Sequence, residues 1–394
     1  MHVSKTRHIS FFDTTLRDGE QAPGYALTID QKIALAETNE RLGMNVIETG
    51  FPISSPADFE ATRQISQLLK KAKPCGFSRL LKDDIDACAD SMVGHHPDPQ
   101  IELLVSSSDI HIRYKQGSTR EAITEQTRAA VRHAKERGFT DISLALEDAT
   151  RADVAFLKEL SGHAIDEGVT TLAVPDTVGC ALPGEYKELI SEIRAFVGED
   201  ITVSVHTHDD LGLAVANSLA GLEGGANEVQ TTLCGIGERA GNCSFEEMVA
   251  ILANKQHQLG MTYDIVQHRI HQATAQLAEY VNLRLPRHKS IIGENAFATA
   301  AGIHQQGVMK YRFIYEFMRA EDFGGESRIV VGRHSGRSIL RQRLNEAGIK
   351  DIEPTRLDAL YATVMTSGRA EDYNDAKLLA DLYAGLDADV DLAS

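Results

Sequence analysis

Short apolar segments rich in β-branched residues alternate with amphipathic segments over the first 265 residues of the chain. Eight of them have the length and composition of strands, at residues 8–14, 45–51, 73–79, 101–107, 141–147, 171–177, 202–208 and 228–235. Helix starts between them are marked by a capping box at 28–31 and by Ser55 followed by proline. Strands that alternate with helices pair in parallel, and eight of them predict an α/β fold, a closed (β/α)8 TIM barrel. An open doubly wound sheet is the alternative, but no Gly-x-Gly-x-x-Gly motif follows the first strand.

The pattern changes after about residue 265, where helical periodicity continues without intervening strands. We therefore expect a barrel over residues 1–265, followed by small helical subdomains over residues 266–394. A stripe of leucines at 378, 379, 382 and 386 predicts an amphipathic helix that packs on the barrel or on a partner subunit. No pattern for an additional regulatory domain is visible, and we expect none.

The composition is ordinary for a soluble globular protein, with 42% hydrophobic and 25% charged residues. The formal net charge of −17 argues against nucleic acid or an anionic membrane as a partner. Five cysteines are scattered without a Cys-x-x-Cys pair, which is typical of free thiols in a reducing compartment. The N-terminus lacks the apolar core of a signal peptide, and no segment approaches transmembrane length. These features predict a cytoplasmic enzyme.

Two histidines lie two residues apart at the end of the seventh predicted strand. Side chains at i and i+2 of a strand share a face, so His206 and His208 can bind one metal ion together. Asp18, after the first strand, can add a carboxylate oxygen, and Arg17 beside it carries a permanent positive charge that suits an oxyanion. Catalytic residues of such barrels lie at the C-terminal ends of the strands, so we expect all four at one site. The residue types predict a Lewis-acid centre for an anionic carbonyl substrate.

Three further polar residues end or follow predicted strands and are expected at the same end of the barrel. Glu147 ends the fifth strand, and Thr177 ends the sixth with a hydroxyl for a substrate carboxylate. Asn242, in a glycine-rich segment after the eighth strand, can offer an amide oxygen as a fourth protein ligand. Structural alternatives remain open, because Glu147 and Thr177 also suit helix caps, and Arg17 also suits an ion pair with Glu48.

Long motifs of the chain resemble those of the 2-isopropylmalate synthases. These belong to a group of metal-dependent acetyl-CoA-condensing and lyase barrels that includes the homocitrate and citramalate synthases. The resemblance runs from about residue 8 to about residue 340 and rests on the segments FDTTLRDGEQ, ETGFPISSPADFE, EDATRAD, PDTVG, HTHDDLGLAVANS, GIGERAGN, GIHQQG and GRHSGR. It implies a Claisen condensation of acetyl-CoA with a 2-oxo acid, followed by thioester hydrolysis. It also implies a homodimer and a divalent metal ion, Mn²⁺, Mg²⁺ or Zn²⁺.

The resemblance assigns roles to individual residues. The metal falls on the three ligands predicted above, with Asn242 completing or supporting their shell. Arg17 is expected to polarise the ketone carbonyl or the thioester enolate, and Thr177 to reach the carboxylate of the 2-oxo acid. Glu147 and His304, the latter in GIHQQG, are expected to move the proton of the acetyl methyl group.

Two positions on the face toward the substrate depart from the pattern of the 2-isopropylmalate synthases. Glu102 stands where those enzymes have histidine, and Ala145 where they have serine. A buried carboxylate repels a second carboxylate, so we expect dicarboxylic acceptors to be poor. An acceptor with an apolar side chain or a hydrogen-bond donor is favoured instead. The alternative is that Glu102 pairs with a neighbouring base and never contacts the substrate.

Together these observations predict an acyltransferase that forms a 2-alkylmalate-type product and CoA, with leucine biosynthesis as the pathway. Homocitrate, citramalate or specialised alkylmalate synthesis from another 2-oxo acid is the alternative, as is a lyase of the same superfamily. A catalytically silent ligand-binding protein is a different class and would be expected to lack part of the constellation. With no regulatory domain expected, feedback inhibition by leucine is expected to be absent.

Overall fold

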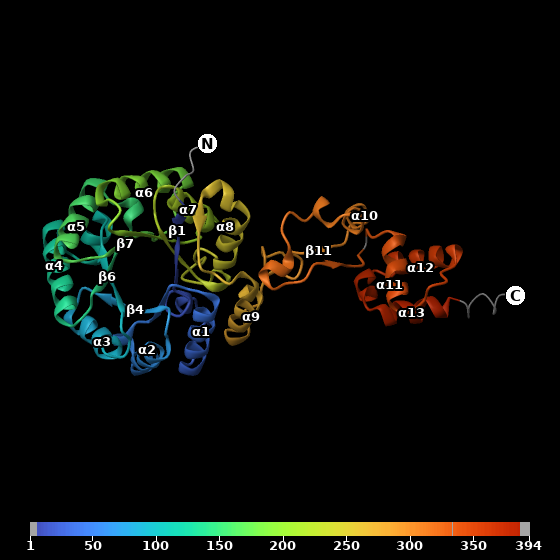
Figure 1. The fold of residues 1–394 in the computed structure, drawn as a ribbon, viewed down its shortest axis with the longest axis horizontal. Helices are drawn as coiled ribbons and strands as arrows, with labels where there is room; N and C mark the ends of the chain where they lie inside the picture. The colour runs from blue at the N-terminus through green and yellow to red at the C-terminus, as the bar shows by residue number, and fades with distance from the viewer. Residues whose placement is uncertain (1–5, 333, 387–394) are drawn as a thin grey trace. The chain divides into compact units, whose positions relative to one another are not determined.

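A computed structural model describes residues 6–332 and 334–386, which fall into two compact units divided between Arg284 and Leu285. In the first unit, eight parallel strands close into a barrel in which each strand pairs with its successor and β9 pairs with β2 (Figure 1). They are β2 (Ser10–Asp13), β3 (Val46–Gly50), β4 (Lys73–Arg79), β5 (Gln100–Ser106), β6 (Asp141–Glu147), β7 (Thr171–Asp176), β8 (Thr202–Thr207) and β9 (Glu228–Thr231). The predicted (β/α)8 barrel is confirmed.

A helix follows each barrel strand, and the helices form a ring around the barrel (Figure 1). They are α1 (Ile29–Leu42), α2 (Pro56–Leu68), α3 (Lys82–Met92), α4 (Arg120–Glu136), α5 (Val154–Glu167), α6 (Pro183–Val197), α7 (Ala214–Glu223) and α8 (Phe245–Leu259). The side chains of Thr28 and Ser55 cap α1 and α2 as predicted, each accepting a hydrogen bond from a backbone N–H of the first turn.

Strand register places the polar side chains of the barrel interior at defined levels. Glu102 of β5 lies opposite Ser143 of β6, and Ser106 lies opposite Glu147 at the C-terminal ends of the same strands. Side chains two residues apart in a strand share a face, so all four point into the barrel. Glu102 and Glu147 therefore line the same cavity, one below the other.

Six of the eight strands end earlier than predicted, β9 by four residues and the others by one, and the ends of β9 and β8 shape the site. β9 ends at Thr231 rather than at residue 235, because Leu233–Gly235 forms a 3-10 turn in which Cys234 adopts a φ of 61°. β8 ends at Thr207, and His208 beyond it forms an isolated antiparallel bridge with Asn242. This bridge connects the loop after β9 to the end of β8.

The first unit extends past residue 265, where strand alternation ends in the sequence. Helix α9 (Ile270–Tyr280) belongs to it, and Thr38 of α1 donates a hydrogen bond to the side chain of Gln276 at 2.8 Å. The short strands β1 (Arg7–His8) and β10 (Met261–Thr262) pair in parallel within the same unit.

The second unit is largely helical, with α10 (Gly302–Lys310), α11 (Arg337–Glu346), α12 (Pro354–Thr366) and α13 (Ala376–Gly385). It also holds a parallel pair of two-residue strands, β11 (Ala298–Thr299) and β12 (Arg328–Ile329). The predicted leucine stripe packs within this unit: Leu379 is buried in its core, with Leu382 and Leu386 against it, whereas Leu378 is exposed. Among the described residues, no helix has both the length and the apolar character needed to cross a membrane.

Candidate active site and metal centre

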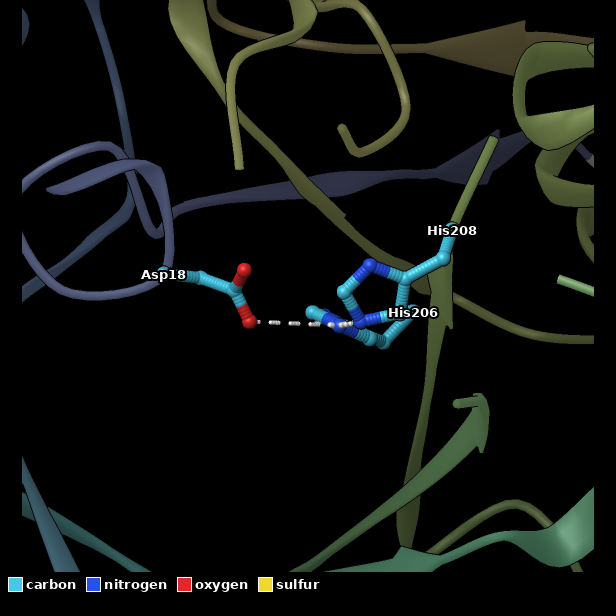
Figure 2. A group of neighbouring side chains, drawn as sticks. All are labelled: Asp18, His206 and His208. Carbon is cyan, nitrogen blue, oxygen red and sulfur yellow. Dashed lines mark hydrogen bonds and ion pairs between the residues drawn. The ribbon is translucent and has the colours of Figure 1, made fainter. Parts of the chain in front are cut away.

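Three predicted metal ligands meet at the C-terminal end of the barrel (Figure 2). The Nε2 atoms of His206 and His208 lie 3.2 Å apart, and Oδ2 of Asp18 lies 3.7 Å from Nε2 of His206. All three side chains are buried, and their ligand atoms lie within 4.8 Å of one another. In Figure 2 the carboxylate of Asp18, from the turn after β2, faces both imidazoles. The structure thus brings together residues from opposite ends of the barrel sequence, as predicted.

The turn after β2 fixes Asp18 in this position. The backbone N–H groups of Arg17 and Gly19 both donate to the carbonyl oxygen of Thr14, at 3.2 and 3.1 Å. The hydroxyl of Thr14 also accepts a hydrogen bond from the backbone N–H of Asp18 at 3.3 Å. The short compact turn therefore presents the carboxylate toward β8.

The protonation states of the three residues suit a divalent cation. Burial, the largest single effect, opposes ionisation of Asp18, but Arg17, the two histidines and the hydrogen bond from Asn242 together outweigh it and hold the pKa of Asp18 below its usual range. Burial lowers the pKa of His206 to about 3, and it also lowers the pKa of His208. At neutral pH the site therefore presents one carboxylate and two neutral imidazoles, a donor set that borderline divalent metals prefer.

Asn242 lies beside this group, with its amide nitrogen turned toward the carboxylate. Nδ2 donates to Oδ1 of Asp18 at 2.9 Å and to the carbonyl oxygen of Ile236 at 3.2 Å. Its buried Oδ1 has no hydrogen-bond partner among the described residues. Nδ2 therefore supports Asp18, the second of the two predicted roles, and the unpartnered Oδ1 leaves the predicted ligation as a prediction.

Gly237 is required by the close approach of this loop. A Cβ atom at Gly237 would overlap Nδ2 of Asn242 and come within 3.1 Å of Oδ1 of Asp18. A side chain here would therefore push apart the two residues that hold the carboxylate in place.

Arg17 is held between two carboxylates at the edge of the cavity. Its Nε lies 2.9 Å from Oε2 of Glu48, and its Nη1 lies 2.9 Å from Oδ2 of Asp18. The guanidinium also lies over the ring of Phe77, 4.6 Å from its centroid. Burial alone would lower the pKa of Arg17, but the charges of Glu48 and Asp18 raise it. The ion pair with Glu48 thus exists, and Arg17 lines the cavity as well.

Glu147 accepts hydrogen bonds on both carboxylate oxygens. Oε1 lies 2.5 Å from Nζ of Lys115, and Oε2 accepts from the hydroxyl of Ser106 at 3.0 Å and lies 3.2 Å from Nδ1 of His111. Thr177 accepts a hydrogen bond from a backbone N–H, that of Asp148, at 2.8 Å, which leaves its own hydroxyl proton free to donate. Glu147 and Thr177 both line the cavity and cap no helix.

One cavity of about 260 Å³ contains these groups. Its polar wall includes Arg17, Glu147, Thr177 and the three predicted metal ligands, and its apolar wall consists of Phe77, Leu104, Ala145, Ala173 and Pro175. Glu102 lies in the same wall, where its Oε2 accepts hydrogen bonds from Ser143 and Gln230, both at 3.0 Å. Burial raises the pKa of Glu102. Both departures noted in the sequence, at 102 and 145, therefore face the cavity.

His304 lies in the second unit, on α10. Its exposed ring stacks on that of Tyr315, with centroids 4.3 Å apart. The other predicted site residues all belong to the first unit. The proton-transfer role of His304 stays a prediction.

The site contains polar residues that were not predicted from the sequence, and three of them contact Glu147 or His206. Lys115 and His111 lie on a π-helical turn after β5, and Gln230 lies on β9. A polar side chain in a buried strand, two residues before the strand's C-terminal turn, is the available signal for Gln230. For Lys115 a signal is the short basic run at 111–115 in an otherwise acidic chain.

The chain matches two family models. The model described as HMGL-like covers residues 8–279. The model described as homocitrate synthase post-HMGL domain-like covers residues 291–370. The first spans the barrel, and the second lies within the C-terminal unit.

Proteins named 2-isopropylmalate synthase are similar over nearly the whole chain. The protein of Pseudoalteromonas atlantica is 40% identical over 381 residues, which cover 95% of this chain and 73% of the relative. The protein of Bacillus licheniformis is 38% identical over 379 residues, covering 95% and 72%. The protein of Sediminispirochaeta smaragdinae is 40% identical over 378 residues, covering 94% and 74%.

Solved structures of HMG-CoA lyases share the fold. The lyase of Brucella melitensis superposes with a TM-score of 0.59 at 18% identity, covering 70% of this chain and 99% of the lyase. The lyase of Pseudomonas aeruginosa superposes with a TM-score of 0.60 at 17% identity, covering 71% and 94%. At these identities the likeness supports the barrel fold alone.

Proposed function

The chain belongs to the HMGL-like family and, within it, to the family of the 2-isopropylmalate synthases, and we propose that it condenses acetyl-CoA with a 2-oxo acid. The products are a 2-alkylmalate and CoA. The observation that carries this proposal is the buried group of Asp18, His206 and His208 beside Arg17, in a chain 40% identical to a named 2-isopropylmalate synthase over 95% of its length. By the names of these relatives, we place the reaction in leucine biosynthesis.

The condensation joins two carbon atoms and then releases CoA. The methyl carbon of the acetyl thioester gives up a proton, and the resulting enolate attacks the ketone carbon of the 2-oxo acid. The ketone oxygen takes up a proton to become the tertiary hydroxyl of the product. Water then cleaves the C–S bond of the thioester, which yields a carboxylate and the CoA thiol. Negative charge develops on the enolate oxygen and on the ketone oxygen, and each of them needs positive charge nearby.

We infer that Asp18, His206 and His208 hold one divalent cation, of which Mn²⁺, Mg²⁺ and Zn²⁺ are the candidates. Bound there, it would serve as a Lewis acid for the 2-oxo acid. Asn242 holds the carboxylate of Asp18 through its Nδ2 and so supports the ligand set.

Arg17 is proposed to stabilise negative charge on the reacting oxygens. Its two ion pairs fix the guanidinium in place before the substrate arrives, so little reorganisation is needed as charge develops. Thr177, whose hydroxyl oxygen accepts from the backbone N–H of Asp148, can donate its hydroxyl proton to the carboxylate of the 2-oxo acid. Glu147 is proposed to accept the proton of the acetyl methyl group, and His304 is proposed to take part in the same proton transfer.

The acceptor pocket supports an apolar side chain on the 2-oxo acid. Leu104, Ala145, Ala173 and Pro175 offer an apolar surface, and Glu102 adds one carboxyl group to it. A second carboxylate on the acceptor would face that group in a buried environment. We therefore favour 2-oxoisovalerate over 2-oxoglutarate, and a 2-isopropylmalate-type product over a homocitrate-type product.

A thiol-release assay with acetyl-CoA and a panel of acceptors tests the function. We expect CoA release that depends on both a divalent cation and a 2-oxo acid, fastest with 2-oxoisovalerate, and a product with the mass of the condensed acid. Absence of acceptor-dependent thiol release with all three cations would refute the proposal. Cleavage of a 3-hydroxyacyl-CoA to acetyl-CoA without any condensation would support the lyase alternative instead. The homodimer and the cytoplasmic location stay predictions.

A further inference from the structure

We propose that Gln230 is a positioning residue for His206 and that Glu102 fixes the orientation of its amide, so that a three-residue hydrogen-bond chain prepares one ligand of the metal site. The inference rests on the metal site proposed above. It assigns Glu102 a task distinct from acceptor recognition.

This hydrogen-bond chain crosses the barrel interior from β8 to β9 and on to β5. Nδ1 of His206 lies 2.8 Å from Oε1 of Gln230, and Nε2 of Gln230 donates to Oε2 of Glu102 at 3.0 Å. The hydroxyl of Ser143 on β6 reaches the same carboxylate oxygen, also at 3.0 Å. His206 is 6% exposed, Glu102 and Gln230 are each 2% exposed, and Ser143 is 1% exposed. Bulk water therefore offers no ready replacement for these bonds.

The contact with Gln230 determines which ring nitrogen of His206 carries the proton. An amide oxygen can only accept a hydrogen bond, so Nδ1 of the neutral imidazole must be the protonated nitrogen. Nε2 is then left with its lone pair. That atom faces Oδ2 of Asp18 at 3.7 Å and Nε2 of His208 at 3.2 Å. Gln230 thus selects the tautomer that can bind a cation through Nε2.

Glu102 in turn determines which end of the Gln230 amide faces the histidine. Oε2 of Glu102 receives two donors, the amide nitrogen of Gln230 and the hydroxyl of Ser143, so it acts as an acceptor. A flipped amide would place its oxygen against this acceptor and its N–H₂ group against Nδ1 of His206. The contact between the two oxygens would be unfavourable in the buried interior, so the observed orientation is held. The flipped N–H₂ group would also place the ring proton on Nε2, the nitrogen that faces the metal site.

Such support has a measurable effect in metal sites. When the second nitrogen of a ligating histidine donates to a fixed acceptor, the ring orientation and the tautomer are set and the first nitrogen becomes a better ligand. Loss of the acceptor typically costs 10–100-fold in metal affinity. Side chains that only filled the barrel interior would not need hydrogen-bond donors and acceptors in this order.

The test is the affinity of the metal-free protein for Mn²⁺ alone and for Zn²⁺ alone, without substrate. Gln230→Leu keeps the approximate volume and removes the acceptor, so we expect affinity to fall by about 10–100-fold. Ser143→Ala is the matched control, because it removes the other donor to Glu102 and leaves the Gln230 amide in place. We expect its affinity to stay within about threefold of wild type. Should Gln230→Leu fail to fold, Gln230→Asn withdraws the amide oxygen by one methylene and is expected to lower affinity in the same direction.

A double variant separates the hydrogen-bond chain from mere packing. Glu102→Gln with Gln230→Glu exchanges the two groups: the carboxylate at 230 accepts from His206, and the amide at 102 donates to it. We expect this variant to restore affinity to within about threefold of wild type. Long-range ¹H–¹⁵N spectra of the metal-free protein should show the ring of His206 protonated at Nδ1 in wild type and in the double variant, and a mixture of tautomers in Gln230→Leu.

The outcomes separate this inference from the metal site on which it rests. A wild-type protein that binds neither Mn²⁺ nor Zn²⁺ would overturn the metal site. A wild-type protein that binds, together with Gln230→Leu of unchanged affinity and an unchanged His206 tautomer, would overturn the positioning role alone.

Discussion

Nζ of Lys115 lies 2.5 Å from Oε1 of Glu147, so the carboxylate proposed as a base carries a cation at one of its oxygens. Burial of Glu147 opposes ionisation, but the hydrogen bond and charge of Lys115 and the neighbouring His111 together outweigh it and lower the pKa of Glu147. The pair keeps this carboxylate ionised, and therefore able to accept a proton, well below neutral pH.

Replacing Lys115 is expected to move the acidic side of the pH–activity profile. In Lys115→Met the pKa of Glu147 rises, so a higher pH is needed to ionise it, and the acidic limb of kcat/KM should move up by roughly one pH unit. Lys187→Met removes a lysine that pairs with Glu223 on the barrel exterior and serves as the control. An acidic limb at the wild-type position in Lys115→Met would show that Glu147 does not limit the rate.

Removing one imidazole of the metal centre is expected to abolish metal binding and turnover together. His206→Ala leaves two of the three predicted ligands, which is too few to hold the ion tightly, and we expect at least roughly 100-fold loss of turnover. Metal analysis of the purified variant checks this. His133→Ala, which removes a histidine paired with Asp86, is the control. Full metal occupancy with full activity in His206→Ala would contradict the assignment.

The acceptor ranking is expected to depend on the charge at position 102. In Glu102→His the repulsion of a second carboxylate is gone, and the ratio of kcat/KM for 2-oxoglutarate to that for 2-oxoisovalerate should rise by about tenfold, or about 1.4 kcal/mol. The ratio isolates the pocket effect, because any weakening of the metal site through Gln230 affects both acceptors. An unchanged ranking would mean that Glu102 serves only its partners in the barrel wall.

The size of the acceptor is expected to be limited at position 145. Ala145 is buried in the cavity wall, and Ala145→Leu would fill part of the space that a branched acceptor needs. We expect kcat/KM for 2-oxoisovalerate to fall about tenfold relative to that for pyruvate. Equal losses for both acceptors would indicate that the acceptor side chain lies elsewhere.

Glu228, in the barrel interior at the start of β9, is expected to make stability fall as pH rises. Burial raises its pKa to about 7 in spite of hydrogen bonds from Ser204 and Ser10, the latter at 3.0 Å. Between the usual pKa of glutamate and about 7, the folded protein holds a proton that the unfolded chain has released. The free energy of unfolding should therefore decline over this range, by up to roughly 3 kcal/mol from this group.

Urea unfolding at pH 5 and pH 8 measures this effect. Glu228→Gln cannot ionise, so it should be more stable than wild type at pH 8 and close to it at pH 5. If the free energies of unfolding of wild type and Glu228→Gln differ by the same amount at both pH values, Glu228 does not titrate on unfolding.

The parts of the site that could be predicted from the sequence are those fixed by local geometry. His206 and His208 share a face because a strand repeats every two residues, and Asp18 meets them because all barrel strands end on one side. The contact between Gln230 and His206 depends on the pairing of β8 with β9, which no local pattern specifies. The contact between Lys115 and Glu147 depends on a π-helical turn whose shape is set by packing around it. Strand periodicity likewise gave no sign that β9 stops at Thr231, because Cys234 adopts a left-handed conformation that side chains rarely take.

The close fit of Gly237 against Asn242 and Asp18 has a consequence for how the protein tolerates mutation. Gly237 has no side chain to take part in the reaction, yet any residue with a Cβ atom would displace the neighbours that orient a metal ligand. In a saturation library scored for growth of the host, Gly237 should tolerate substitution as poorly as His206 and His208 do. When the same library is scored for the amount of folded protein, the Gly237 variants should differ little from wild type. Variants of this loop glycine would then accumulate as intact, inactive enzyme.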